Sequence, residues 1–169
     1  RFAFSLCHFI NNEADGFGGA LYLTSTEHVR MSTCTFESNK AKKGSGGAIY
    51  ASSLDLLLVV NCKFGNNYAS KEGHAIYSTS EMKKLLVQDC NYSNNINLEN
   101  DNIQLQYMIV LENGGIDIFD VRFRCNSENK ISYPILFKSM NVIENIKFTN
   151  VVSEYSPLLY IFDEMNDYE

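Results

Sequence analysis

Hydrophobic and polar residues recur along this chain in one order, at steps of 27, 28 and 28 residues. Each copy has an aromatic residue, a cysteine two positions before it and an asparagine three positions after it. The aromatic residues are Phe9, Phe36, Phe64 and Tyr92, the cysteines are Cys7, Cys34, Cys62 and Cys90, and the asparagines are Asn12, Asn39, Asn67 and Asn95. Because one unit of this length is too small to bury its own apolar face, the repeat predicts stacked units with a shared core.

The apolar residues within each copy alternate as in a β-strand. In the third copy, Leu57 and Val59 lie seven and five positions before Phe64, which is the two-residue period of a strand. The phase of this alternation changes near Asn61, and asparagine tolerates bent or left-handed backbone, so we expect a corner there. A third strand is expected after each asparagine, at residues 18–22, 46–50, 73–77, 102–105, 134–137 and 157–160.

Three short strands and three bends in each unit predict an all-β, right-handed parallel β-helix of about six coils. The fifth and sixth coils are aligned on Phe123 and Phe148, with Val121 and Ile146 at the cysteine position and Asn145 at the last corner. We expect a single β-helix segment of a longer solenoid, with regular repeats over 1–95, degenerate repeats over 96–162 and an acidic tail over 163–169. Adjacent coils or other domains of the parent chain would continue it.

Composition narrows the classes of function. The chain has 169 residues, of which 45% are hydrophobic and 20% are charged, so it is long and apolar enough to form a core. A formal net charge of −6 argues against nucleic-acid binding, which depends on clustered Lys and Arg. No apolar run is long enough to span a bilayer, so we expect no membrane insertion by this segment.

The cysteines occupy a position that accepts Val121 and Ile146 in later copies, so we interpret them as small buried hydrophobic residues. Disulfides between adjacent coils are also compatible with the spacing of stacked strands. A linear column offers no tetrahedral zinc geometry, and we predict no metal or cofactor. Cys125 lies outside the column and is predicted to be the most accessible thiol.

The repeated asparagines are predicted to hold a bend by bonding up and down the stack, with Asn126 in the fifth copy and Val151 in the sixth. The three histidines, at positions 8, 28 and 74, fall at different repeat positions and predict no cluster. Among the outward positions beside the aromatic residues, Glu37 is the only acid, so no catalytic residue is predicted.

One outward-facing set is apolar and is predicted to dock a neighbouring domain, a loop or a partner chain. Its members are Leu58, Val60, Leu86 and Phe119. Two alternatives would also account for apolar residues at these positions. A loop of the same segment could cover them, or the strand could curl toward the interior more than the alternation implies.

The Phe-x-x-Asn motifs at Phe9, Phe36 and Phe64, interleaved with Gly-Gly-Ala-(Leu/Ile) at 18–21 and 46–49, resemble the polymorphic outer-membrane protein repeat. His74 and Tyr92 depart from that pattern. The resemblance implies a β-helical passenger or surface adhesin that is exposed or secreted, is not an enzyme and uses no cofactor. Its partner would be a protein or a glycan on a host or neighbouring surface. The alternative is a polysaccharide-binding or polysaccharide-cleaving, pectate-lyase-like β-helix whose active coils lie largely outside this segment.

Overall fold

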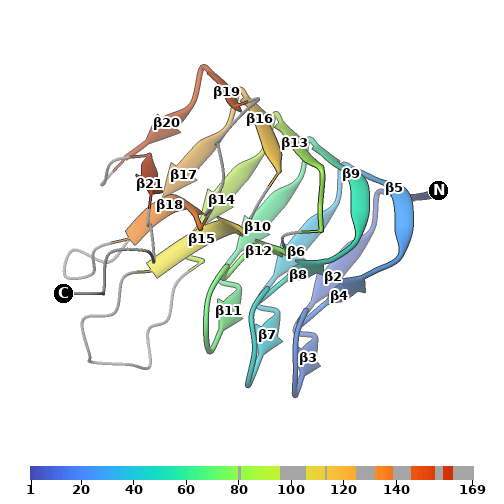
Figure 1. Ribbon diagram of the computed structural model, residues 1–169. Coiled ribbons are helices and arrows are strands. Elements are labelled where there is room, and N and C mark those ends of the chain that lie inside the picture. The colour runs from blue at the N-terminus through green and yellow to red at the C-terminus, as the bar shows by residue number, and fades with distance from the viewer. Residues whose placement is uncertain are drawn as a thin grey trace, which may run out of the picture.

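The computed structural model is an all-β solenoid in which every recorded strand pairing is parallel (Figure 1). It describes residues 1–79, 81–95, 106–112, 114–124, 132–138, 146–154 and 158–161. Strands from successive repeats lie beside one another in four sheets, named A to D here in the order in which the chain first enters them.

Three sheets have six strands each within the described residues, and the fourth has three. Sheet A contains β1 (Phe2–Ser5), β5 (Thr26–Ser32), β9 (Leu54–Val60), β13 (Lys84–Gln88), β16 (Gly115–Phe119) and β19 (Ile146–Thr149). Sheet B contains β2 (His8–Ile10), β6 (Thr35–Glu37), β10 (Lys63–Gly65), β14 (Asn91–Ser93), β17 (Arg122–Arg124) and β20 (Val152–Ser153). Sheet C contains β3 (Glu13–Ala14), β7 (Lys40–Ala41) and β11 (Tyr68–Ala69). Sheet D contains β4 (Leu21–Leu23), β8 (Ile49–Ala51), β12 (Ile76–Ser78), β15 (Gln106–Leu111), β18 (Ser132–Phe137) and β21 (Leu159–Ile161).

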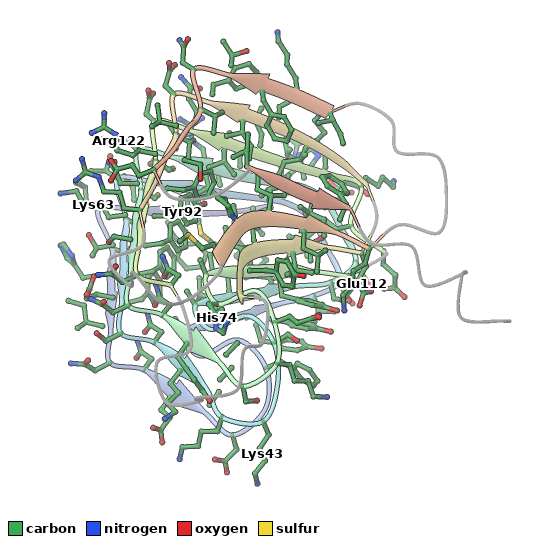
Figure 2. All side chains as sticks on the ribbon, turned by 90° about the vertical axis from the view of Figure 1, so that its left-hand side faces the viewer. Lys43, Lys63, His74, Tyr92, Glu112 and Arg122 are labelled. Carbon is green, nitrogen blue, oxygen red and sulfur yellow. The ribbon has the colours of Figure 1, made fainter. Side chains whose placement is uncertain are left out.

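The core lies inside the solenoid, where like residues face like residues. In sheet B, Phe36 pairs with Phe64 and Phe64 pairs with Tyr92, and the ring centroids are 4.8 and 4.7 Å apart. Phe9 and Phe123 extend this stack at its two ends, with centroids 4.7 and 4.9 Å from their neighbours. Figure 2 shows Tyr92 within the solenoid, whereas Lys63 and Arg122 project outward from the same sheet.

Left-handed backbone marks the corner between sheets A and B. The residues there with positive φ are Leu6, Thr33, Asn61, Asp89, Asp120 and Asn150. A second series with positive φ follows sheet B and was not predicted from the sequence; its members are Asn11, Ser38, Asn66 and Asn94. Both series turn the chain without a long loop.

Glycines permit the turn into sheet D. Gly46 has φ +73°, and a Cβ there would lie 2.5 Å from the carbonyl oxygen of Ile49. A Cβ on Gly47 would lie 2.1 Å from the carbonyl oxygen of His74 in the next repeat. The repeated Gly-Gly pair therefore serves both a left-handed conformation and close packing between neighbouring repeats.

The register predicted for the sixth copy is wrong. Phe148 pairs with Ile118 in sheet A, and Ser153 takes the place beside Phe123 in sheet B. The corner falls at Asn150, with φ 52°, instead of at Asn145. Ile146 therefore pairs with Ile116 and does not continue the cysteine position.

Two further differences concern the strands after each asparagine. The two-residue strands of sheet C lie between each asparagine and the next predicted strand, where no strand was predicted. In the fourth repeat, sheet D receives β15, which begins at Gln106, whereas the predicted strand at 102–105 lies outside the described residues. Cys125, Asn126 and the acidic tail at 163–169 also lie outside them.

Candidate functional site

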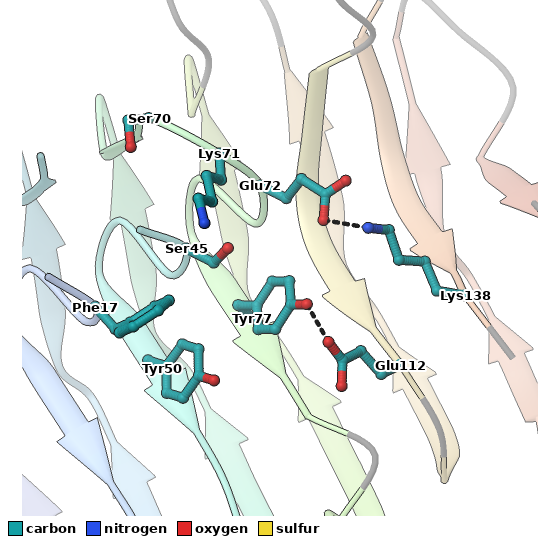
Figure 3. A pocket seen from close by; sticks show the side chains of 9 residues that line it. All are labelled: Phe17, Ser45, Tyr50, Ser70, Lys71, Glu72, Tyr77, Glu112 and Lys138. Carbon is teal, nitrogen blue, oxygen red and sulfur yellow. Dashed lines mark hydrogen bonds and ion pairs between the residues drawn. The ribbon is translucent and has the colours of Figure 1, made fainter. Parts of the chain in front are cut away.

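A groove of about 660 Å³ lies on the outer face of the solenoid, beside sheet D (Figure 3). Its described lining combines aromatic, hydroxyl and charged side chains, and we refer to it below as the groove. The lining residues are Phe17, Ser45, Tyr50, Ser70, Lys71, Glu72, Tyr77, Glu112 and Lys138. These side chains come from several different repeats, so the groove exists only when the coils are stacked.

Stacked tyrosines form the floor of the groove. Along β8, Ile49 is buried in the core and Tyr50 points to the opposite face, as the strand period requires. Parallel register places Tyr22 and Tyr77 on either side of Tyr50, with ring centroids 5.2 and 5.4 Å away. We call these three residues the tyrosine column. Tyr22 is 55% exposed, whereas Tyr77 is 7% exposed.

Phe17 forms an apolar wall. It comes from the turn between β3 and β4, and its ring centroid lies 4.8 Å from that of Tyr50 with an interplanar angle of 46°. The Phe17 side chain remains 43% exposed even though it contacts Tyr50. An aromatic ring that is held in place and still open to solvent is suited to contact a ligand.

Polar groups surround this aromatic surface. Ser45 precedes the Gly-Gly pair of the second repeat, and Ser70, Lys71 and Glu72 precede the corresponding turn of the third. Glu72 forms an ion pair with Lys138, with Oε2 and Nζ 2.6 Å apart. The Tyr77 hydroxyl donates a hydrogen bond to Glu112. Figure 3 shows both interactions on the side of the groove that faces away from Phe17.

The two groove phenols stay protonated. Burial raises the pKa of Tyr77, and its hydrogen bond to Glu112 raises that pKa further. Burial also raises the pKa of Tyr50, with smaller contributions from Tyr22 and nearby carboxylates. The groove therefore presents neutral hydroxyls together with two lysines and two glutamates, whose formal charges cancel.

The repeated residues singled out in the sequence line the interior and not the groove. Cys34, Cys62 and Cys90 are buried free thiols, and Cys7 is half-buried. Burial raises the pKa of the Cys34 thiol. The hydrogen bond to Cys62, and burial as well, raise the pKa of the Cys90 thiol. Within the described ranges, no cluster of three or more His, Cys, Asp or Glu residues is arranged to hold a metal ion.

Asparagines form a continuous hydrogen-bonded column next to the aromatic stack. The Asn67 side-chain amide donates to Asn95 Oδ1 at 2.8 Å and to the Phe36 carbonyl oxygen at 3.0 Å. Its own Oδ1 accepts from the backbone N–H and the side-chain amide of Asn39, at 3.0 and 2.9 Å. The same pattern joins Asn39 to Asn12. These bonds satisfy polar groups at the bend, and Asn39, Asn67 and Asn95 are fully buried, whereas Asn12 at the end of the column is exposed.

The apolar set at Leu58, Val60, Leu86 and Phe119 lies on sheet A, away from the groove. Leu58 and Leu86 are directly paired, and all four side chains are half-buried. Asp117 continues their column and forms an ion pair with Lys84 at 3.0 Å. The Lys147 ammonium lies 5.3 Å from the centroid of the Phe119 ring. The docking role of this set stays a prediction.

The tyrosine column was not predicted from the sequence, although a signal for it is present there. Tyrosine follows the Gly-Gly-Ala-(Leu/Ile) element at positions 22 and 50 and the related Gly-His-Ala-Ile element at 77. Since the preceding Leu or Ile faces inward, the period of two places each tyrosine outward. Phe17, Glu112 and Lys138 have no comparable signal, because they follow no repeated pattern.

Comparison with known proteins supports the resemblance carried by the two motifs. A family model of the Chlamydia polymorphic membrane protein repeat matches residues 7–24 and 33–52. No curated protein and no solved structure matches the chain. Within the described residues, no helix has the length and hydrophobicity to cross a membrane.

Proposed function

We propose that this chain is a non-enzymatic, surface-exposed interaction module that attaches to a partner on another surface. The family match and the parallel solenoid fit a surface-associated β-helical module. The groove is the observation that carries the proposal of binding. Its lining side chains lie outside the main hydrophobic core, and yet neighbouring repeats hold them in one fixed arrangement.

A right-handed helix of about six coils is part of the same proposal. The six-stranded arrangement of sheets A, B and D supports the number of coils. Parallel crossover connections are overwhelmingly right-handed, which supports the hand. Such a rod gives the module a rigid core with outer faces that tolerate substitution.

The contacts of the two acids favour binding over cleavage. Glycoside hydrolysis needs one carboxyl group as an acid and another as a base or nucleophile. In the groove, Glu72 is paired with Lys138 and Glu112 accepts a hydrogen bond from Tyr77. We therefore expect no new reducing ends or unsaturated products when the chain is incubated with pectin, cellulose or chitin. Release of either product would favour the alternative of a polysaccharide-cleaving β-helix.

Attachment can be tested with beads coated with the purified chain. We expect saturable binding of these beads to cultured epithelial cells, competed by soluble chain and absent from albumin-coated beads. An antibody against the chain should also label intact cells that produce the parent protein. Attachment no greater than that of albumin beads would refute the proposed binding function for these cells, and labelling only after permeabilisation would refute surface exposure.

A further inference from the structure

We propose that the groove binds an uncharged oligosaccharide, with a sugar ring against Phe17 and sugar hydroxyls toward the Tyr50 hydroxyl and the polar rim. This inference rests on the proposed function and specifies the chemistry of its ligand. A sugar ring has an apolar face of C–H groups and a rim of hydroxyls. The groove offers both matching surfaces at once.

The apolar half of the match comes from the aromatic side chains. Phe17 is 43% exposed and is held by its contact with Tyr50 at a centroid distance of 4.8 Å. Tyr77 is fixed by its neighbours on the same face of sheet D, because it packs with Tyr107, Val110 and Leu136 in a hydrophobic cluster separate from the main core. Rings that are already ordered lose little conformational entropy when a ligand contacts them.

The polar half comes from the rim. Ser45 and Ser70 supply hydroxyls, and Glu72 supplies a carboxylate held by Lys138 at 2.6 Å. Hydroxyls and carboxylates can accept hydrogen bonds from sugar hydroxyls, while the Lys71 ammonium can only donate. The two lysines and two glutamates of the groove cancel in formal charge, so the groove has no strong net field to select an ionic ligand.

The spacing of the tyrosine column favours an extended chain of sugars. Its centroids are 5.2 and 5.4 Å apart, which is close to the length of one sugar unit in an extended glycan. Tyr22 continues the column beyond the groove and is 55% exposed. Successive sugars would therefore follow the stacking direction, from Tyr50 toward the more exposed Tyr22.

The backbone around the groove argues against a peptide that binds as an added strand. That mode of recognition needs free main-chain donors and acceptors along an edge. Here the neighbouring loops bond to each other: Lys71 N–H donates to the Gly44 carbonyl oxygen at 3.2 Å, and Gly46 N–H donates to that of Glu72 at 3.0 Å. These four main-chain groups are therefore already paired and cannot bond to an added strand.

The direct test is an NMR titration of the isotope-labelled chain with cellotetraose, chitotetraose and the acidic probe tetragalacturonate. We expect at least one of the neutral tetrasaccharides to shift groove resonances, and tetragalacturonate to bind more weakly. Phe17→Ala should weaken binding at least about 10-fold, a change of about 1.4 kcal/mol. Phe2→Ala is the matched control, because Phe2 is 63% exposed and lies outside the groove, and it should bind like the wild type.

A second variant protects the test against misfolding. Tyr50→Phe keeps the stacked ring and removes one hydroxyl, so it should fold normally and bind several-fold more weakly. Groove resonances that stay unshifted at about 10 mM of both neutral sugars would overturn the proposal. Tighter binding of tetragalacturonate, or unchanged affinity in both Phe17→Ala and Tyr50→Phe, would overturn it as well.

The bead assay separates this inference from the proposed function. If Phe17→Ala beads attach as well as wild-type beads, attachment stands and the oligosaccharide is not its ligand. If a neutral tetrasaccharide binds the groove and wild-type beads still fail to attach, the carbohydrate site stands and the proposed attachment function fails.

Discussion

Replacing Asn67 with alanine tests the column of buried amides inside the solenoid. The substitution removes the four hydrogen bonds that the Asn67 side chain makes with Phe36, Asn39 and Asn95. A hydrogen bond contributes about 0.5–1.5 kcal/mol net, so we expect a loss of about 2–6 kcal/mol. This is a large part of the 5–15 kcal/mol by which domains are typically stable.

The free energy of unfolding can be measured by urea titration, followed by far-UV circular dichroism and tyrosine fluorescence. Asn91→Ala is the matched control, because Asn91 lies on the exposed face of β14, one repeat away from Asn67 along the chain. We expect the control to change stability by less than about 0.5 kcal/mol. Equal losses in Asn67→Ala and Asn91→Ala would refute the reasoning, because they would show that the buried bonds contribute nothing beyond a surface contact.

Four further predictions concern the interior and the turns. Tyr92→Phe should raise stability by about 1 kcal/mol, because the Tyr92 hydroxyl is buried and has no hydrogen-bond partner among the described residues; a loss of stability in urea would contradict this. Burial also raises the pKa of Tyr92, so the native chain holds a proton that the unfolded chain releases above about pH 10. Above that pH, the stability of the wild type should therefore fall more steeply with pH than that of Tyr92→Phe. Equal slopes for the two proteins would contradict this prediction. Gly46→Ala should lower the free energy of unfolding by at least about 2 kcal/mol, because the backbone there is left-handed and the new Cβ would lie 2.5 Å from the Ile49 carbonyl oxygen. Gly16→Ala should change stability little, because nothing lies within 4 Å of its Cβ. Comparable unfolding midpoints for the two variants would disprove the strain at Gly46. Iodoacetamide at pH 8 should modify half-buried Cys7 before buried Cys34, as mapped by mass spectrometry, and the reverse order would contradict the burial.

Much of the fold follows from the sequence because the same physical demand recurs in each repeat. A stacked aromatic position must meet another flat ring, so Phe36, Phe64 and Tyr92 share one spacing. A left-handed corner tolerates few residue types, so the corner at Asn61 could be predicted from the sequence. The additional strands of sheet C were missed, because two residues are too few for an alternating pattern to be recognised.

The sixth copy shows where periodicity fails. Phe148 occupies an inward position of sheet A, which in the first repeat is occupied by Phe4. An inward position there accepts any large apolar side chain, so a phenylalanine does not by itself identify the aromatic stack of sheet B. Ser153 occupies the expected aromatic position beside Phe123, which removed the signal for the correct register.

The groove could be predicted only in part. The outward direction of Tyr50 follows from the strand period once Ile49 is assigned to the core. The positions of Glu112 and Lys138 do not, because each follows the end of a strand in a repeat whose length departs from the regular spacing. Their contacts with Tyr77 and Glu72 depend on the register between neighbouring strands of sheet D.

The most direct test of the account is disulfide formation between outward residues that are directly paired in sheet B. Thr35 and Lys63 face each other in register, and Asn91 lies one strand further along. Neighbouring strands are about 4.8 Å apart, which is within the range that a disulfide can bridge. Under mild oxidation, peptide mapping should find a cross-link in Thr35→Cys/Lys63→Cys and none in Thr35→Cys/Asn91→Cys. Equal yields in the two variants, or no cross-link in the first, would contradict the stacking of successive repeats.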